Sequence, residues 1–428
     1  MLVSLTRVGA SRQRFDKTFA VVGVKPDVVT HAFAQADLRL GGERLRVSAG
    51  VPGLFAVGLP MSWLGTRPAR GDVFTELASV LAELATIAER IGGVLVPAGV
   101  APAPHPAVPG GDLHVLEVIG SVEQEVLCNL LRSCVPALIA MTGRGVTVSG
   151  GRPDRVGSRW LAGSTTHLAT RFLASTASDH LDRVKAELRR RDGVAQLDRM
   201  DISPVELPDG GRGVVVRCLE SAPTLAAVRA QALVLSALAM RARRLVRDGR
   251  RAGHEPQRTL EENRARAVAD GFRARFVVEE RPRGQTGRRP ETSRLPARDA
   301  VRRLLQETAV EFRGLDAGVD ELAPFLLAVD LAGLGLRNAA AERDLLTQWA
   351  GAGDVELVAR CRGALTDSNA GGPLLAELTA AAPGRVAVVL GEWRRTFADA
   401  VAERPPKRTS GRSAADRQQR RRDREAAR

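Results

Sequence analysis

Apolar residues recur with a helical period over several long stretches of the chain. Residues 72–91 carry them on one face, and Gly92 ends the pattern. A capping-box pattern over 121–124 begins a second helix, and a third is expected over 223–248 after an opening proline. The pattern from 299 to 350 is helical again. The sequence therefore predicts several long amphipathic helices.

Short valine-rich runs between these helices predict strands. They lie at 94–96, 113–119 and 214–219, and a Gly-Gly turn precedes the last of them. The strands and helices do not follow the regular alternation of parallel βαβ units. The fold class predicted from the pattern is therefore α+β.

The charge of the chain is concentrated at one end. The formal net charge is +14, and residues 404–428 hold ten basic and three acidic side chains, half of the excess. We expect 401–428 to be a disordered basic tail. Such a tail can attract phosphates, but it has no aromatic residue on which bases could stack. Nucleic-acid binding through the tail is therefore a less favoured hypothesis.

Apolar runs and cysteines give little sign of a membrane or a metal. No apolar run reaches the length of about 18 residues that suggests a membrane span, and the N-terminal residues lack the apolar centre of a signal peptide. The four cysteines include no CxxC pair, so we expect buried structural side chains. These observations favour a cytoplasmic protein without a membrane partner.

Six short landmarks follow one another from about residue 20 to 350. They are Val22-Gly23-Val24; the helix at 75–91; Leu113-His114-Val115; Asn129 with 136–141; Val215-Val216-Arg217 through Pro223-Thr224-Leu225; and Glu262-Asn263-Arg264 through Gly271-Phe272. In this order they resemble the carboxylate-amine ligases of the glutamate-cysteine ligase type, which belong to the glutamine-synthetase-like superfamily.

The resemblance implies a fold and a chemistry. The fold is a curved antiparallel sheet that forms a funnel, with helices packed outside it and a helical C-terminal part. The chemistry is ATP-dependent amide formation through an acyl phosphate, for which Mg²⁺ and arginines neutralise charge. The chain then divides into a ligase-like core (1–255), an Arg-rich loop and strand segment that completes it (256–298), a helical region (299–400) and the tail (401–428).

Several positions that carry catalysis in the family hold other residues here. Lys25 stands where metal-binding glutamates are expected, and a lysine about 4 Å from a divalent ion is repelled by about 8 kcal/mol at an effective dielectric near 20. Val215 replaces the glutamate of the Glu-x-Arg strand, whose Arg217 is kept. Leu116 and Ala269 replace a histidine and an arginine.

The resemblance assigns roles to the matching residues that remain. The candidates are Arg217 and Arg159 for catalysis; His114, Asn263, Arg264 and Arg266 for nucleotide binding; and Asp27 and Glu220 as substitute metal ligands. The alternatives are a buried core histidine for His114 and solvated arginines at 264 and 266. We expect His114 and Arg217 to face the same concave side of the sheet.

Two functions follow from this pattern of retained and lost residues. The leading hypothesis is a glutamate-cysteine ligase-like protein that is catalytically degenerate and binds a small molecule, a peptide or a partner protein. The alternative is an active ATP-dependent ligase that joins a carboxylate, of glutamate or a peptide, to an amine, with ATP and Mg²⁺ as cofactors and metal ligands from other positions. The two differ in whether carboxylates converge in the funnel.

Overall fold

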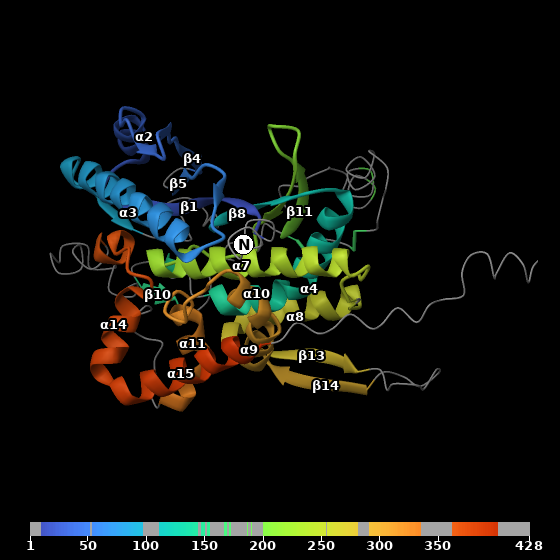
Figure 1. Cartoon of the computed structure of the whole chain (residues 1–428). Coiled ribbons are helices and arrows are strands. Elements are labelled where there is room, and N and C mark those ends of the chain that lie inside the picture. The colour runs from blue at the N-terminus through green and yellow to red at the C-terminus, as the bar shows by residue number, and fades with distance from the viewer. Residues whose placement is uncertain are drawn as a thin grey trace, which may run out of the picture.

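The centre of the structure is an eight-stranded sheet whose strand pairs are antiparallel (Figure 1). The computed structural model describes residues 10–51, 54–96, 111–143, 200–253, 255–280, 291–334 and 362–400, with short pieces between 147 and 190. The strand order is β11-β12-β8-β1-β5-β4, and β6 and β7 also pair with β1. The strands are β1 (Arg12–Val22), β4 (Val47–Val51), β5 (Leu54–Gly58), β6 (Ser62–Trp63), β7 (Val94–Val96), β8 (Leu113–Val118), β11 (Ile202–Glu206) and β12 (Arg212–Val216).

Three small two-stranded sheets lie outside this order. They are β2 (Arg39–Leu40) with β3 (Glu43–Arg44), β9 (Thr147–Ser149) with β10 (Arg152–Asp154), and β13 (Arg275–Glu280) with β14 (Glu291–Pro296).

Helices cover one face of the large sheet and build the remainder of the body (Figure 1). Helices α4 (Ser121–Thr142) and α7 (Leu225–Arg247) pack against β8, β11 and β12. The others are α2 (Pro26–Ala34), α3 (Arg67–Arg90), α8 (Gln257–Asp270), the short η2 (Gly271–Arg273), α9 (Ala297–Glu307), α10 (Ala309–Gly314), α11 (Ala323–Leu334), α14 (Gly372–Ala381) and α15 (Pro383–Asp399). The α+β class with an antiparallel sheet is confirmed, and the funnel stays a prediction.

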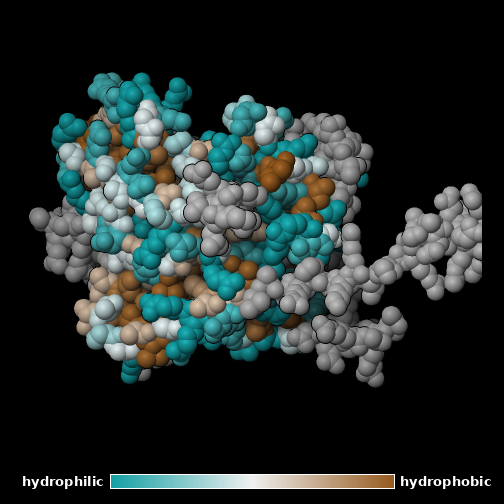
Figure 2. Space-filling view, in the orientation of Figure 1, coloured by the Kyte–Doolittle hydropathy of each residue, from teal (hydrophilic) through white to brown (hydrophobic). Residues whose placement is uncertain are grey.

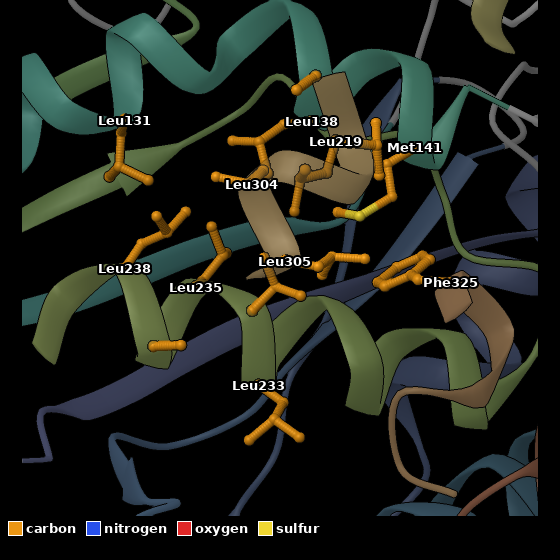
Figure 3. Close-up of a cluster of buried hydrophobic side chains, with 14 of the residues drawn as sticks. Leu131, Leu138, Met141, Leu219, Leu233, Leu235, Leu238, Leu304, Leu305 and Phe325 are labelled. Atoms are coloured by element: carbon orange, nitrogen blue, oxygen red, sulfur yellow. The ribbon is translucent and has the colours of Figure 1, made fainter. Parts of the chain in front are cut away.

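The largest apolar core lies between α4, α7 and the C-terminal helices. Figure 3 shows leucines of α4 and α7 meeting Leu304 and Leu305 of α9 and Phe325 of α11. Helices α4 and α7 are long and apolar enough to span a membrane, but 83% and 89% of their most apolar windows are buried within the protein. Their apolar character is therefore explained by core packing.

The surface over the C-terminal helices mixes polar and apolar residues (Figure 2). Helix α15 buries Val386, Val389, Trp393 and Phe397, while Val388 is 61% exposed. Isolated exposed apolar residues of this kind are ordinary in a folded protein.

The structure differs from the predicted elements in several places. The strand expected at 214–219 is β12, which begins at Arg212 and ends at Val216, and the strand expected at 113–119 ends at Val118. The helix expected at 72–91 begins at Arg67, because Pro68 fits its first turn and Thr66 takes the N-cap position. The segment 256–298, expected as loop and strand, begins with helix α8 and continues into the β13–β14 hairpin. The helical pattern of α8 is weak in the sequence because its buried face includes Thr259 and Asn263.

Polar side chains are buried on the face of the sheet that α4 and α7 cover, here called the inner face. His114 of β8 lies between Gln13 (Nε2 to Nδ1, 2.8 Å) and Gln231 (Nε2 to Oε1, 3.3 Å), and Ser236 donates to Gln13 Oε1. Because Gln13 donates to Nδ1 through its amide, the network assigns the ring proton to Nε2. Burial lowers the pKa of His114 to about 4, so the ring is neutral near pH 7.

A buried ion pair involves Lys17, in the middle of β1. The Lys17 ammonium, which has no exposed surface, donates to Asp112 (3.0 Å), Ser221 (2.8 Å) and the Thr18 carbonyl (2.7 Å). Asp112 also accepts from the backbone N–H of Thr18 and of Ala222. Burial lowers the pKa of Lys17, and the charge of Asp112 opposes this effect. The ion pair therefore ties β1 to the chain before β8 and to the segment after β12.

A buried arginine joins α3 to the C-terminal helices. Arg70 contacts Glu321 through two hydrogen bonds (2.9 and 2.7 Å) and donates to the carbonyls of Leu64, Leu315 and Asp316. A residue one turn away makes a similar but exposed pair, Arg67 with Asp320. These two pairs form a matched comparison of buried and exposed ion pairing.

Replacing Arg70 and Arg67 separately by alanine tests this comparison. Arg70→Ala leaves Glu321 buried without its partner, so the free energy of unfolding should fall by about 3–5 kcal/mol. Arg67→Ala should cost less than about 1 kcal/mol, because that pair is exposed to water. Urea unfolding followed by circular dichroism measures both, and equal losses would contradict the structural role given to Arg70.

The buried His114 predicts how stability depends on pH. Its folded pKa is about 4 and its ordinary value is 6.5. Between these values the unfolded chain binds a proton that the folded chain does not, so the free energy of unfolding falls as pH falls through this window, by up to about 3 kcal/mol. Below pH 4 the contribution is constant.

A His114→Gln variant separates this contribution from that of the carboxylates. Acidic groups titrate alike in both proteins, so the variant should lose less stability than the wild type between pH 6.5 and 4. Urea midpoints measured across this range give the difference. Parallel pH profiles would mean that His114 is not held neutral in the core.

Candidate functional site

The opposite face of the sheet, here called the outer face, carries charged side chains at its centre. Side chains alternate along β1, so Arg12, Arg14 and Asp16 point away from the inner-face residues. Arg12 Nε donates to Glu117 Oε2 of β8 (2.9 Å), and Asp209 lies 3.5 Å from the same guanidinium. Arg14 contacts Asp16 through two hydrogen bonds of 3.2 Å. Each of these carboxylates is therefore engaged by an arginine of β1.

The ion pairing changes the electrostatics of the outer face. The hydrogen bond from Arg12 lowers the pKa of Glu117 more than partial burial raises it. The same hydrogen bond raises the pKa of Arg12. Both groups therefore stay charged across the physiological range. The Nη1 atoms of Arg12 and Arg14 take no part in these pairs, and both side chains are 46% exposed.

A small apolar cluster, here called the floor, lies beside these charges. Val115, Val215 and Leu207 form a small buried cluster, against which Met61, Leu113 and Val205 pack. Arg217 follows β12 and donates to Ser203 Oγ of β11 (2.6 Å). Ser203 pairs in register with Val215, which places the floor and Arg217 on the same face. The outer face thus combines guanidinium groups with an aliphatic surface.

The expectation that His114 and Arg217 share a face is wrong. His114 pairs in register with Val216, so both point to the inner face, and Arg217, the next residue, points to the outer one. His114 is fully buried among glutamines, as expected for a core histidine. The nucleotide contact expected of His114 and the catalytic role expected of Arg217 stay predictions.

The residues expected at the nucleotide from α8 have partners within the protein. Arg264 forms a two-bond ion pair with the buried Asp201. Asn263 bonds the N–H and the carbonyl of Val277, and Arg266 contacts Glu262 and the Arg275 carbonyl. These contacts hold the β13–β14 hairpin and the end of β11 against α8, which gives the three residues a structural role.

The structure does not bring the proposed metal ligands together. Asp27 is exposed in the first turn of α2, whereas Glu220 is buried beside Thr142 of α4 and Gln231 of α7. Lys25 is exposed and immediately precedes α2. It therefore lies outside the sheet and does not repel a cation bound there. In the part of the chain that the structure describes, no group of three or more His, Cys, Asp or Glu could hold a metal ion. Arg159 lies outside the described residues.

Sequence reasoning missed the charged residues of β1. The landmark Val22-Gly23-Val24 lies at the C-terminal end of β1, and the charged residues of that strand precede it. A period of two was present in charges at 12, 14 and 16, and it would have identified the strand. Gln13 and Lys17 concealed the pattern because they occupy inner-face positions where apolar residues are expected.

No family model and no curated protein matches the sequence. Among solved structures, the chain is similar to the Pup ligase PafA in complex with the prokaryotic ubiquitin-like protein Pup (12% identity; 91% of this chain and 81% of that one; TM-score 0.49).

Two further similar structures are those of a glutathione synthetase and a glutamate–cysteine ligase. One is a bifunctional glutathione synthetase from Pasteurella multocida (10% identity; 89% of this chain and 54% of that one; TM-score 0.47). The other is glutamate–cysteine ligase from Francisella tularensis in complex with AMP (10% identity; 92% and 95%; TM-score 0.47). The chain spans about half the length of the glutathione synthetase.

Proposed function

We propose that this chain is a glutamate-cysteine ligase-like protein that binds an anionic small molecule or peptide on the outer face and does not carry out Mg²⁺-dependent ATP chemistry. One observation carries the proposal. Asp16 and Glu117, the carboxylates at the centre of the outer face, are each bonded to an arginine of β1. The order of the six sequence landmarks supports the ligase-like part of the proposal.

The residues of the outer face do not fit a Mg²⁺ ion. Mg²⁺ needs carboxylate oxygens that are free to coordinate it. An ion held by Glu117 or Asp16 would lie near the guanidinium of Arg12 or Arg14, and at about 5 Å the repulsion is roughly 7 kcal/mol at an effective dielectric near 20. A metal ion would therefore have to displace the arginines first.

The same arrangement suits an anion. The Nη1 groups of Arg12 and Arg14 can donate to a carboxylate or phosphate while their other nitrogens stay bonded to Glu117 and Asp16. The neighbouring cluster of Val115, Val215 and Leu207 can cover an apolar part of the same ligand. A ligand with one anionic group and an aliphatic portion fits both features.

A single-turnover assay tests the absence of catalysis. Radiolabelled ATP, glutamate and a pool of amino acids are mixed with the protein, with and without Mg²⁺. We expect no ADP above background, because the described residues offer no cluster of carboxylates for the ions that neutralise phosphoryl charge in the transition state. Metal-dependent release of ADP would favour the alternative of an active ligase with metal ligands from other positions.

Equilibrium binding of metal-free ATP, used as a polyanionic probe, tests whether the anion site lies on the outer face. Binding should weaken when Mg²⁺ is added, because the metal cancels charge that the arginines attract, and it should weaken in Arg14→Gln. Arg39→Gln is the matched control, since Arg39 of β2 is exposed in an ion pair with Asp37, which precedes the strand. Equal affinity of Arg14→Gln and the wild type would contradict the outer-face site.

A further inference from the structure

The β13–β14 hairpin stands apart from the large sheet. Figure 1 shows it extending from the body beside α8, with β14 as the outermost strand. The two strands pair over six residues each, from Arg275 with Pro296 to Glu280 with Glu291, without a shift in register. A two-stranded sheet has two edges, and the outward N–H and carbonyl groups of each edge need hydrogen-bond partners.

The β13 edge is covered by α8. The Asn263 side chain bonds both the N–H (2.6 Å) and the carbonyl (2.8 Å) of Val277, as a neighbouring strand would. Arg266 donates to the Arg275 carbonyl, and Thr259 donates to the Glu279 side chain. Helix α8 therefore closes this edge with side chains.

The orientation of Val277 determines which groups of β14 point outward. Because its N–H and carbonyl face α8, Val277 and its partner Arg294 form a pair that is not hydrogen-bonded within the hairpin. The backbone groups of Arg294, and by alternation those of Thr292, therefore point away from β13. Within the described residues no hydrogen bond engages these outward groups, and both residues are exposed.

Natural edges are protected by bulges, by prolines within the strand, by charged side chains or by a covering element. Among the described residues, β14 has only one of these features, the charge of Arg294. Here the register is regular, and Pro296 lies at the end of the strand. Arg294 lies opposite Val277 in the hairpin, and its guanidinium has no ion-pair partner among the described residues. The edge thus offers backbone groups and one positive charge together.

We propose that β14 is a docking edge for an extended segment of a partner protein that carries an acidic residue opposite Arg294. Such a segment would add a third strand through the N–H and carbonyl groups of Thr292 and Arg294. An acidic side chain across from Arg294 supplies the missing opposite charge, and an apolar residue can lie beside the half-buried Leu295 on the other face. Main-chain bonds give affinity, and these two positions give specificity.

A second copy of this chain fits the edge less well. Antiparallel pairing of β14 with itself places Arg294 opposite Thr292 or opposite another Arg294 in the two registers that keep both residues within the strand. Neither register supplies a carboxylate, and the second brings like charges together. Charge therefore favours an acidic partner.

The test uses two capped hexapeptides of alternating valine with glutamate or with lysine, titrated against the full chain by isothermal calorimetry. The glutamate peptide should bind, and the lysine peptide should bind several-fold more weakly. Thr292→Pro removes one outward N–H and keeps the hairpin ladder, as proline is tolerated on strand edges, so it should weaken binding of the glutamate peptide by up to about tenfold. Thr292→Ala is the matched control, because it removes the same side chain and keeps the outward N–H.

Charge reversal provides a second readout, which is the preference between the two peptides and not the affinity for one of them. Arg294→Glu should exchange the preference, so that the lysine peptide binds more tightly than the glutamate peptide. Equal binding of both peptides by the wild type, unchanged binding by Thr292→Pro, or no binding of either peptide would overturn the proposal. Dimerisation in sedimentation that Thr292→Pro abolishes would also overturn it, in favour of a second copy.

Discussion

The alternation of side chains along β1 is the constraint on which both faces of the sheet depend. This strand pairs with β5, β6, β7 and β8, so its geometry orients their side chains as well. On the inner face, Gln13 and Lys17 are buried and need the partners that His114 and Asp112 provide. On the outer face, the arginines of the same strand engage the nearby carboxylates. A shift of one residue would exchange these two chemistries and leave charges in the core.

Local patterns predicted the helices well. Helices α3, α4 and α7 bury broad apolar stripes, and β8 and β12, expected at 113–119 and 214–219, are valine-rich runs near turn residues. The order of these elements along the chain is enough to indicate the α+β class. Helix α8 was missed because its buried face combines few apolar residues, such as Leu260 and Ala267, with the polar Thr259 and Asn263, and Asn263 bonds the hairpin.

The candidate site was harder to predict because it depends on contacts between distant residues. Lys17 has an acceptable environment only because Asp112 lies 95 positions later, and no window of the sequence contains both. The side on which His114 and Arg217 lie follows from the register between β8 and β12, which residue types alone do not determine. The expected metal ligand Asp27 lies on α2, because the turn after β1 leads into a helix whose weak apolar pattern did not identify it.

The account rests on arginines occupying the carboxylates of the outer face. Mn²⁺, which replaces Mg²⁺ in oxygen-rich sites and is detected by electron paramagnetic resonance, probes this directly. Titration of the wild type should leave Mn²⁺ free, because Glu117 and Asp16 are paired with Arg12 and Arg14. Mn²⁺ binding by the wild type that Glu117→Gln or Asp16→Asn weakens would contradict the account.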